Sequence, residues 1–191
     1  MKICVLGLGY IGLPTALLLA NAGNEVIGVD TNNKIIEKLN NGKIPFEEPG
    51  IKELLRNAMK NFAAKDEVEE SDVFLIAVPT PLESSLKIAD LKAVRSAAKM
   101  IRPHLQEGNL VILESTVPPG TSEKLLIPML EKNRLGVGDF HLAYCPERAI
   151  PGKTIHEMTN NDRIIGGYDN KSAEMAKLLY ASFVKGIFLK I

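Results

Sequence analysis

The sequence predicts an α/β fold in which helices cover both faces of a mainly parallel sheet. First, a short apolar run at 3–6 passes directly into a glycine-rich turn, and a helix-like segment and a second apolar run follow. Second, the continuous apolar runs at 73–78 and 110–113 have the composition of strands that are buried on both faces. Third, helix-like segments separate these runs, and strands that alternate with helices form parallel sheets.

Three glycines, Gly7, Gly9 and Gly12, follow the first apolar run in the spacing GxGxxG. In dinucleotide-binding turns the first glycine permits the tight turn, the second lets a pyrophosphate approach the backbone, and the third lets the helix pack against the sheet. The helix N-terminus would then offer free N–H groups and a partial positive charge to the phosphates. A purely structural turn is the alternative, but the strand, helix, second strand and terminal acid around these glycines favour dinucleotide binding.

The second apolar run ends in Asp30, whose carboxylate would accept hydrogen bonds from the adenosine ribose hydroxyls. This acid would repel a 2′-phosphate, and the next residues, Thr31, Asn32 and Asn33, include no arginine to hold one. The sequence therefore favours NAD over NADP as the cofactor. Lys34 is the one nearby cation that could favour NADP instead.

Periodicity assigns the elements that come next. The segment 34–39 places its apolar residues on one helical face, and Asn-Asn-Gly at 40–42 ends that helix. Gly50 precedes a second helix of the same kind. Five acids crowd the segment 65–72, which we interpret as a solvent-exposed loop, with a metal or partner site as the alternative.

Prolines and apolar runs define the rest of the chain. Pro79 and Pro81 end the strand before them, because proline cannot donate a ladder hydrogen bond. Pro128 should kink the helix predicted at 122–132 or limit it to short turns. Residues 1–191 are therefore expected to form one Rossmann-like, doubly wound domain. The other predicted elements are helices at 89–101 and 172–183 and strands at 110–113, 140–144, 163–167 and 187–189.

The composition is that of an ordinary globular domain, and it argues against several kinds of partner. A chain of 191 residues, of which 46% are hydrophobic, can bury one core. The formal net charge is zero, so we expect neither nucleic acid nor an anionic membrane surface as a partner. No apolar run reaches the length of a membrane span, and the N-terminus is interpreted as the first strand rather than a signal peptide.

The cysteines and histidines predict neither a disulfide framework nor a metal site. Cys4 and Cys145 are too few for such a framework and lack metal-ligand spacing, which favours a reducing cytoplasm. His104, His141 and His156 are scattered without the spacing of metal ligands.

Hydroxyl side chains follow the ends of two predicted strands. Thr80 lies between two prolines after the strand 73–78, and Ser115 and Thr116 follow the strand 110–113. Ligands of doubly wound sheets bind beyond the carboxyl ends of the strands, so Thr80 is expected beside the cofactor. A polar ligand also suits Ser115 and Thr116, for which a helix cap is the alternative role.

Taken in order, five sequence blocks resemble the UDP-glucose/GDP-mannose dehydrogenase family. They are GLGYIGLPTA from Gly7, AVPTP from Ala77, ESTVPPGT from Glu114, YCPERAIPG from Tyr144 and NDRIIGG from Asn161. The last two blocks are most similar to the branch that acts on UDP-N-acetyl-D-mannosamine. The resemblance implies oxidation of the C6 hydroxyl of a UDP-sugar to a carboxylate by two hydride transfers to two NAD.

The resemblance also implies roles for particular residues. It implies that Arg148 and Ala149 contact the nucleotide sugar, and it places Thr116 beside the reacting groups. It further implies a UDP-sugar as the substrate and a homodimer of the full-length enzyme. The residues implied to contact NAD, besides the three glycines, are Tyr10, Ile11, Asp30, Thr80 and Thr116.

Two positions depart from the family pattern, and part of the pattern would lie beyond this chain. Ile35 stands where family members usually carry an arginine, so a cation for the adenosine phosphate is lost. Pro151 stands where UDP-glucose enzymes carry a second glutamate, so a water-activating role for that acid cannot be transferred. The family's catalytic lysine, asparagine and nucleophilic cysteine and its C-terminal UDP-binding domain would follow Ile191. We therefore expect residues 1–191 to be the N-terminal, NAD-binding part of a longer dehydrogenase, and to be inactive alone.

Glu147 is the main catalytic candidate within the chain, as an acid/base or water-orienting group. A salt bridge to Arg148 or Arg163 is its alternative role. Cys145 is a poor candidate for the nucleophile, because neither a helix N-terminus nor a neighbouring base is evident to lower its pKa. A non-catalytic NAD-sensing or nucleotide-binding module is the alternative function, and the sugar-contacting arginine that the resemblance implies favours the enzyme.

Overall fold

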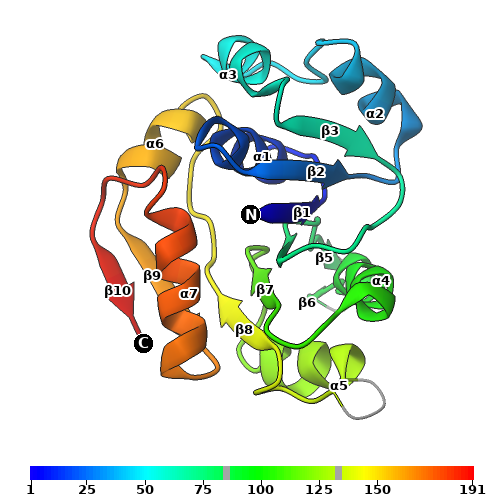
Figure 1. The fold of residues 1–191 in the computed structure, drawn as a ribbon, viewed down its shortest axis with the longest axis vertical. Helices are drawn as coiled ribbons and strands as arrows, with labels where there is room; N and C mark the ends of the chain where they lie inside the picture. The colour runs from blue at the N-terminus through cyan, green and yellow to red at the C-terminus, as the bar shows by residue number, and fades with distance from the viewer. Residues whose placement is uncertain (84–86, 132–134) are drawn as a thin grey trace.

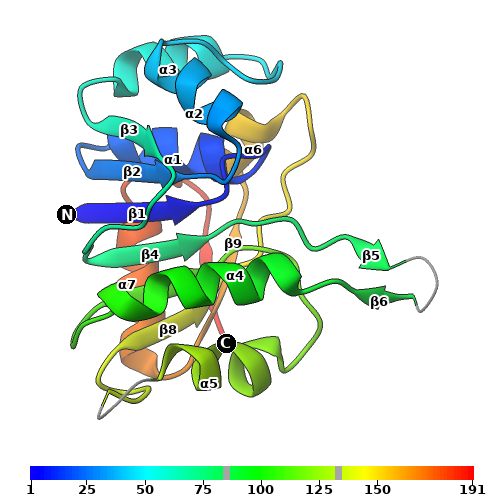
Figure 2. The ribbon, with the colours of Figure 1, turned by 90° about the vertical axis from the view of Figure 1, so that its right-hand side faces the viewer.

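The structure, a computed structural model, describes residues 1–83, 87–131 and 135–191. An eight-stranded sheet runs through it in the order β10-β9-β8-β7-β4-β1-β2-β3. The strands β5 (Leu82–Glu83) and β6 (Ile88–Ala89) form a separate hairpin that projects beyond this sheet in Figure 2. The strands of the large sheet are β1 (Lys2–Leu6), β2 (Glu25–Val29), β3 (Phe62–Lys65), β4 (Val73–Ile76), β7 (Leu110–Leu113), β8 (His141–Tyr144), β9 (Arg163–Gly167) and β10 (Phe188–Lys190).

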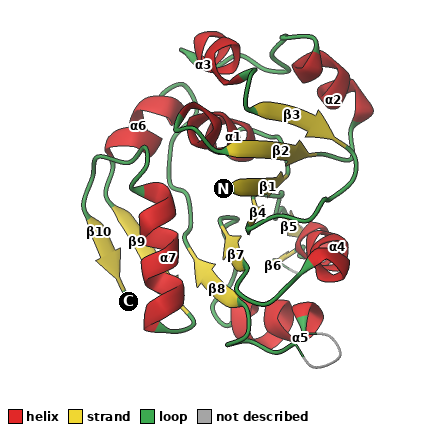
Figure 3. Cartoon of the chain, viewed as in Figure 1, coloured by secondary structure: helices red, strands yellow, loops and turns green. Residues whose placement is uncertain are grey.

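Helices cover both faces of the sheet, as predicted (Figure 1). Successive side chains of a strand point to opposite faces, so Ile3 and Val5 of β1 pack with α1, α3 and α7. Cys4 and Leu6 point the other way and join the core under α4 and α5. The helices, shown in red in Figure 3, are α1 (Gly12–Asn21), α2 (Asn33–Asn40), α3 (Ile51–Ala58), α4 (Lys92–Ile101), α5 (Ile127–Leu130), α6 (Thr154–Asn160) and α7 (Asn170–Tyr180).

The strand directions confirm a mainly parallel sheet. Every neighbouring pair from β3 to β8 is parallel, and β10 is parallel to β9. β9 runs antiparallel to β8, so the last two strands are reversed relative to the rest. β1 lies between β2 and β4, where the order of the strands changes direction. Doubly wound sheets bind ligands beyond the carboxyl ends of the strands at such a point.

Three predicted helices have different bounds in the structure, and the one expected at 172–183 is α7, Asn170–Tyr180. The helix expected at 89–101 begins at Lys92, because Ile88–Ala89 pairs with β5 in the hairpin. The helix expected at 122–132 consists of a π-helical turn, Ser122–Leu126, followed by α5. Pro128 follows shortly after this π-helical turn, and a missing N–H at this position prevents a regular α-helix from running through 122–130. The expected end of that helix at Lys132 lies outside the described residues.

The strand β3, the hairpin and α6 were not predicted. β3 ends at Lys65, and the acidic segment after it is a loop, as expected, although one of its acids is structural. Glu69 accepts hydrogen bonds from the Nζ atoms of Lys65 and Lys2, the latter at 2.9 Å, and these bonds lower the pKa of Glu69 to about 2. This carboxylate therefore links the first residue of β1 to the last residue of β3.

Candidate functional site

A cavity of about 890 Å³ lies beyond the carboxyl ends of β1, β2, β4 and β7. Most of its lining comes from four segments that the sequence pointed to: the glycine turn, the end of β2, the Pro-Thr-Pro segment and the segment after β7. The rest comes from α4, Ile35 and Glu147. The fold thus brings together at one sheet edge residues that are far apart in the sequence. The predicted site residues that line the cavity are Gly7, Gly9, Tyr10, Ile11, Asp30, Thr80, Thr116 and Glu147.

The glycine turn is tightly packed at its first and third glycines and open at the second. Gly7 has a φ of +94°, and a Cβ there would lie 2.6 Å from the carbonyl oxygen of Ala77. A Cβ on Gly12 would lie 1.8 Å from the carbonyl oxygen of Gly7. Around Gly9, no atom lies within 4 Å of the position that a Cβ would take. The backbone of Gly9 is therefore accessible from the cavity, as the approach of a phosphate requires.

Asp30 joins the end of β2 to this turn. Its Oδ2 accepts a hydrogen bond from the N–H of Leu8 at 2.9 Å, and its Oδ1 accepts one from the N–H of Asn32 at 2.8 Å. A carboxylate has about four acceptor positions, so both oxygens can still accept ligand hydroxyls. The half-buried side chain lines the cavity, where ribose hydroxyls could reach it.

An aromatic pair stands at the rim of the same turn. Tyr10 is 50% exposed and stacks against Phe46, with the ring centroids 4.2 Å apart and the ring planes at 30°. Ile35 lines the cavity from α2 with an apolar side chain. At this position, where family members usually carry an arginine, the cavity wall is therefore apolar and not cationic.

Hydroxyl groups connect the ends of β4 and β7. Oγ1 of Thr80 donates a hydrogen bond to the carbonyl oxygen of Thr116 at 2.7 Å, and Oγ of Ser115 donates one to the carbonyl oxygen of Val78 at 2.7 Å. Ser115 is buried and fastens the two strand ends, so its alternative role as a helix cap is wrong. Thr80 and Thr116 come together at the cavity, as the sequence analysis expected.

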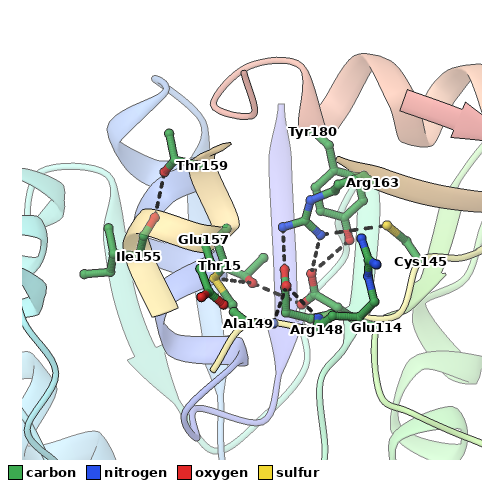
Figure 4. Close-up of polar contacts among 12 residues, drawn as sticks. Thr15, Glu114, Cys145, Arg148, Ala149, Ile155, Glu157, Thr159, Arg163 and Tyr180 are labelled. Carbon is green, nitrogen blue, oxygen red and sulfur yellow. Dashed lines mark hydrogen bonds and ion pairs between the residues drawn. The ribbon is translucent and has the colours of Figure 1, made fainter. Parts of the chain in front are cut away.

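Glu114 is a site residue that the sequence analysis missed, although it begins one of the five blocks. Its side chain is fully buried and lines the cavity, and Figure 4 shows its contacts with Thr15, Arg163 and Tyr180. Oε2 accepts a hydrogen bond from Oγ1 of Thr15 at 3.0 Å, and Oε1 accepts one from the hydroxyl of Tyr180 at 3.1 Å. Burial is the largest cause that raises the pKa of Glu114 to about 7. An acid directly after four buried apolar residues was the one signal that could have revealed it.

Arg163 lies between Glu114 and Glu147 and pairs with both. Its Nη1 is 3.3 Å from Oε1 of Glu114, and its Nη2 is 2.6 Å from Oε2 of Glu147. The other oxygen of Glu147 accepts the N–H groups of Arg148 and Ala149 at 2.7 and 2.9 Å. The salt bridge from Glu147 to Arg163, one of the alternatives for this acid, is therefore present. The one to Arg148 is replaced by a bond from its backbone N–H.

Two other candidates in this block are placed less favourably for chemistry. Cys145 is buried, and its burial raises the pKa of the thiol to about 11, so the thiolate form is scarce at neutral pH. Arg148 is exposed and donates from Nη2 to the carbonyl oxygen of Asp162 at 2.7 Å. Arg148 and Ala149 lie on the loop beside the cavity and do not line it. A sugar-contacting role for these two residues stays a prediction.

The described parts of the chain contain neither a metal-binding cluster nor a helix that could span a membrane. Within 1–83, 87–131 and 135–191, no three or more His, Cys, Asp or Glu side chains are grouped so that they could hold a metal ion. No helix in these ranges is both long and apolar enough to cross a membrane.

Comparison with known proteins relates the chain to one enzyme family. The model of the UDP-glucose/GDP-mannose dehydrogenase family, NAD binding domain, matches residues 1–184. A UDP-N-acetyl-D-mannosamine dehydrogenase of Methanococcus maripaludis is 49% identical over 97% of this chain and 43% of its own length. One of Campylobacter jejuni is 45% identical over 97% of this chain and 48% of its own length. The chain thus spans less than half the length of these curated relatives.

Solved structures agree with this relation. The UDP-N-acetyl-mannosamine dehydrogenase of Staphylococcus aureus superposes with a TM-score of 0.95 at 41% identity, covering 100% of this chain and 47% of that one. A GDP-mannose dehydrogenase of Pseudomonas aeruginosa superposes with a TM-score of 0.90 at 29% identity, covering 100% of this chain and 46% of that one.

Proposed function

Because this chain belongs to the UDP-glucose/GDP-mannose dehydrogenase family, we propose that it is the NAD-binding, N-terminal half of a UDP-sugar 6-dehydrogenase. The complete enzyme oxidises the C6 hydroxyl of its substrate to the uronic acid by two hydride transfers to two NAD. UDP-N-acetyl-D-mannosamine is the proposed substrate, since that sugar nucleotide appears in the names of relatives at 42–49% identity. Another relative, at 44% identity, is an NDP-N-acetyl-D-galactosaminuronic acid dehydrogenase. In this setting the enzyme supplies a uronic acid for polysaccharide synthesis.

One observation carries this proposal: the open glycine and the ribose acid face the same cavity. The space at Gly9 suits a diphosphate, and Asp30, which closes the second strand, suits the adenosine ribose. Thr80 and Thr116, at the other end of the cavity, would hold the nicotinamide half. When bound there, NAD supplies the hydride acceptor for both oxidation steps.

The remaining predicted residues take roles around this cofactor. Glu147 lines the cavity and its oxygens are fixed by three hydrogen bonds, one of them from Arg163, so it suits orienting a water molecule. Thr116 is exposed at the cavity, where its hydroxyl can contact the reacting groups. Arg148 and Ala149 would contact the sugar nucleotide from the adjacent loop. We further propose a cytoplasmic enzyme that acts as a homodimer, with the nucleophilic cysteine supplied by a later part of the protein.

Two measurements test the proposed function. Titration calorimetry of this chain should show binding of NAD and weaker binding of NADP. In a longer protein that includes the family's later domains, NADH formation should be faster with UDP-N-acetyl-D-mannosamine than with UDP-glucose. Binding of NADP as tight as that of NAD would contradict the cofactor assignment. NAD binding without turnover of any UDP-sugar by the longer protein would favour the alternative, an NAD-sensing module.

A further inference from the structure

The cluster beside the cavity contains more negative than positive ionisable groups. Glu114, Glu147 and Arg163 have side chains that are at most 7% exposed, and the guanidinium contacts both carboxylates. With all three ionised, these groups would carry a net charge of −1 in a buried place. An uncompensated buried charge is costly, and a group in this situation usually takes up a proton instead. A proton held within the cluster would remove this uncompensated charge.

The hydrogen bonds show which carboxylate holds that proton. Glu147 faces only donors: one guanidinium at 2.6 Å and two backbone N–H groups, which cannot accept a proton from it. Glu114 faces the hydroxyls of Thr15 and Tyr180, which can act as donors or acceptors. Thr15 also lies 3.9 Å from the sulfur of Met158 and can donate there while it accepts from Glu114. Glu114 is therefore the proton-holding acid, in agreement with its raised pKa of about 7.

No neighbour of Glu114 in this cluster competes for that proton near neutral pH. Burial raises the pKa of Cys145 to about 11 and that of Tyr180 well above its ordinary value, so both stay protonated. Burial lowers the pKa of Arg163, but the negative charges around the guanidinium outweigh this effect, so Arg163 stays charged. The groups that face Glu114 are Thr15 from α1, Met158 from α6, Arg163 from β9, Tyr180 from α7, and Cys145 and Glu147 from the segment after β8.

Glu114 lines the same cavity that the cofactor would occupy, so a charge on the cofactor can affect the proton on this acid. Glu114, Thr116 and Glu147 line the cavity at the end away from Asp30. This step rests on the proposed function, in which Asp30 holds the adenosine ribose and the nicotinamide half lies at the opposite end. The nicotinamide ring carries a positive charge in NAD⁺ and none in NADH. Charges in a poorly solvated site interact strongly, so a cationic ring favours the ionised form of a nearby acid.

We propose that Glu114 responds to the redox state of the cofactor: binding of NAD⁺ expels the proton that Glu114 holds in the free chain, whereas binding of NADH leaves that proton in place. The proton passes to solvent. The neutral acid of the free chain thereby becomes a carboxylate beside the cationic ring of bound NAD⁺. Affinity for NAD⁺ then rises with pH through neutrality, and affinity for NADH does not. The ionised carboxylate thus favours the oxidised cofactor before hydride transfer and disfavours the reduced one after it.

Titration calorimetry of this chain in two buffers of different ionisation enthalpy measures the protons released on binding. Near pH 7 we expect about half a proton released per NAD⁺ and close to none per NADH. From pH 6 to pH 8 the affinity for NAD⁺ should rise by about tenfold, because Glu114 with a pKa of about 7 loses most of its proton over this range in the free chain and holds none in the complex. Glu114→Gln should abolish both effects. The matched control is Glu53→Gln, which changes an exposed acid on α3 and should preserve both.

The comparison of the two cofactors keeps the test valid even if Glu114→Gln fails to fold, because it uses the unaltered chain. Equal proton release with NAD⁺ and NADH would overturn the inference, and so would release that persists in Glu114→Gln. Binding of both cofactors with no proton release would overturn the inference and leave the proposed function standing. Binding of neither cofactor would overturn the two together.

Discussion

Replacing Gly9 or Gly12 by alanine adds the same methyl group, yet the two changes should damage different properties. At Gly12 the new Cβ would lie 1.8 Å from the carbonyl oxygen of Gly7. Because that contact is with backbone, α1 has to move away from β1. Overpacking a core costs about 1–3 kcal/mol, and this contact should cost at least about 3 kcal/mol. For a domain of this size, that corresponds to a fall in Tm of roughly 6–12 °C.

Gly9→Ala should leave the fold intact and weaken the cofactor instead. No atom lies within 4 Å of the added Cβ, and Gly9 does not have a positive φ, so Tm should change by less than about 1 °C. The methyl group would occupy the space through which a diphosphate approaches the backbone. Loss of one hydrogen bond to a charged group costs about 1.5–3 kcal/mol, which is roughly a tenfold to hundredfold loss of NAD affinity.

Circular dichroism on heating and calorimetry with NAD measure both properties in each variant. Gly136→Ala is the matched control, because it adds a methyl group outside the cavity at a glycine without a positive φ. An unchanged Tm for Gly12→Ala would refute the packing argument. An unchanged NAD affinity for Gly9→Ala would refute the placement of the diphosphate.

Three further perturbations test other parts of the site. Asp30→Asn should weaken NAD binding by about tenfold. It should also reduce the ratio of NAD affinity to NADP affinity, because the variant lacks the charge that repels a 2′-phosphate. Calorimetry with both cofactors would contradict this if that ratio of affinities stayed constant. Glu48→Ala should lower Tm by several degrees, since the Glu48 carboxylate accepts the N–H groups of Gly152 and Thr154 at 2.8 Å each, and Glu48→Gln should lower it less. Equal falls in Tm would count against that account. Burial raises the pKa of Glu114 from 4.5 to about 7, so the folded chain binds more protons than the unfolded chain between these values. The free energy of unfolding should therefore fall by up to about 3 kcal/mol as the pH rises through this window, and urea unfolding of Glu114→Gln should lack the fall.

The adenosine end of the site could be predicted because its signals are local. Gly7, Gly9 and Gly12 lie within one turn, and Asp30 ends the next strand. The hydrogen bond that joins this acid to Leu8 spans 22 positions, within a single β-α-β unit. One supersecondary unit with a fixed handedness therefore determines the arrangement.

The charged cluster could not be predicted in the same way. The partners of Glu114 are Thr15, Arg163 and Tyr180, at separations of 99, 49 and 66 positions. No local pattern tells whether an acid at the end of a strand points into the cavity or into the core. Two missed elements have a similar cause, since β3 has four residues and α6 seven, too few for a clear period.

The reversal of β9 explains how this cluster can exist at all. Tyr144 of β8 pairs with Gly166 of β9 in antiparallel register, so the first residue of β9, Arg163, extends past the carboxyl end of β8. A parallel β9 would begin at the opposite edge of the sheet, because parallel strands start together. Glu114 and Glu147 would then be two buried carboxylates with no guanidinium between them, and each would have to be protonated or exposed. The antiparallel pair therefore supplies the positive charge that lets two acids lie beside the cofactor cavity.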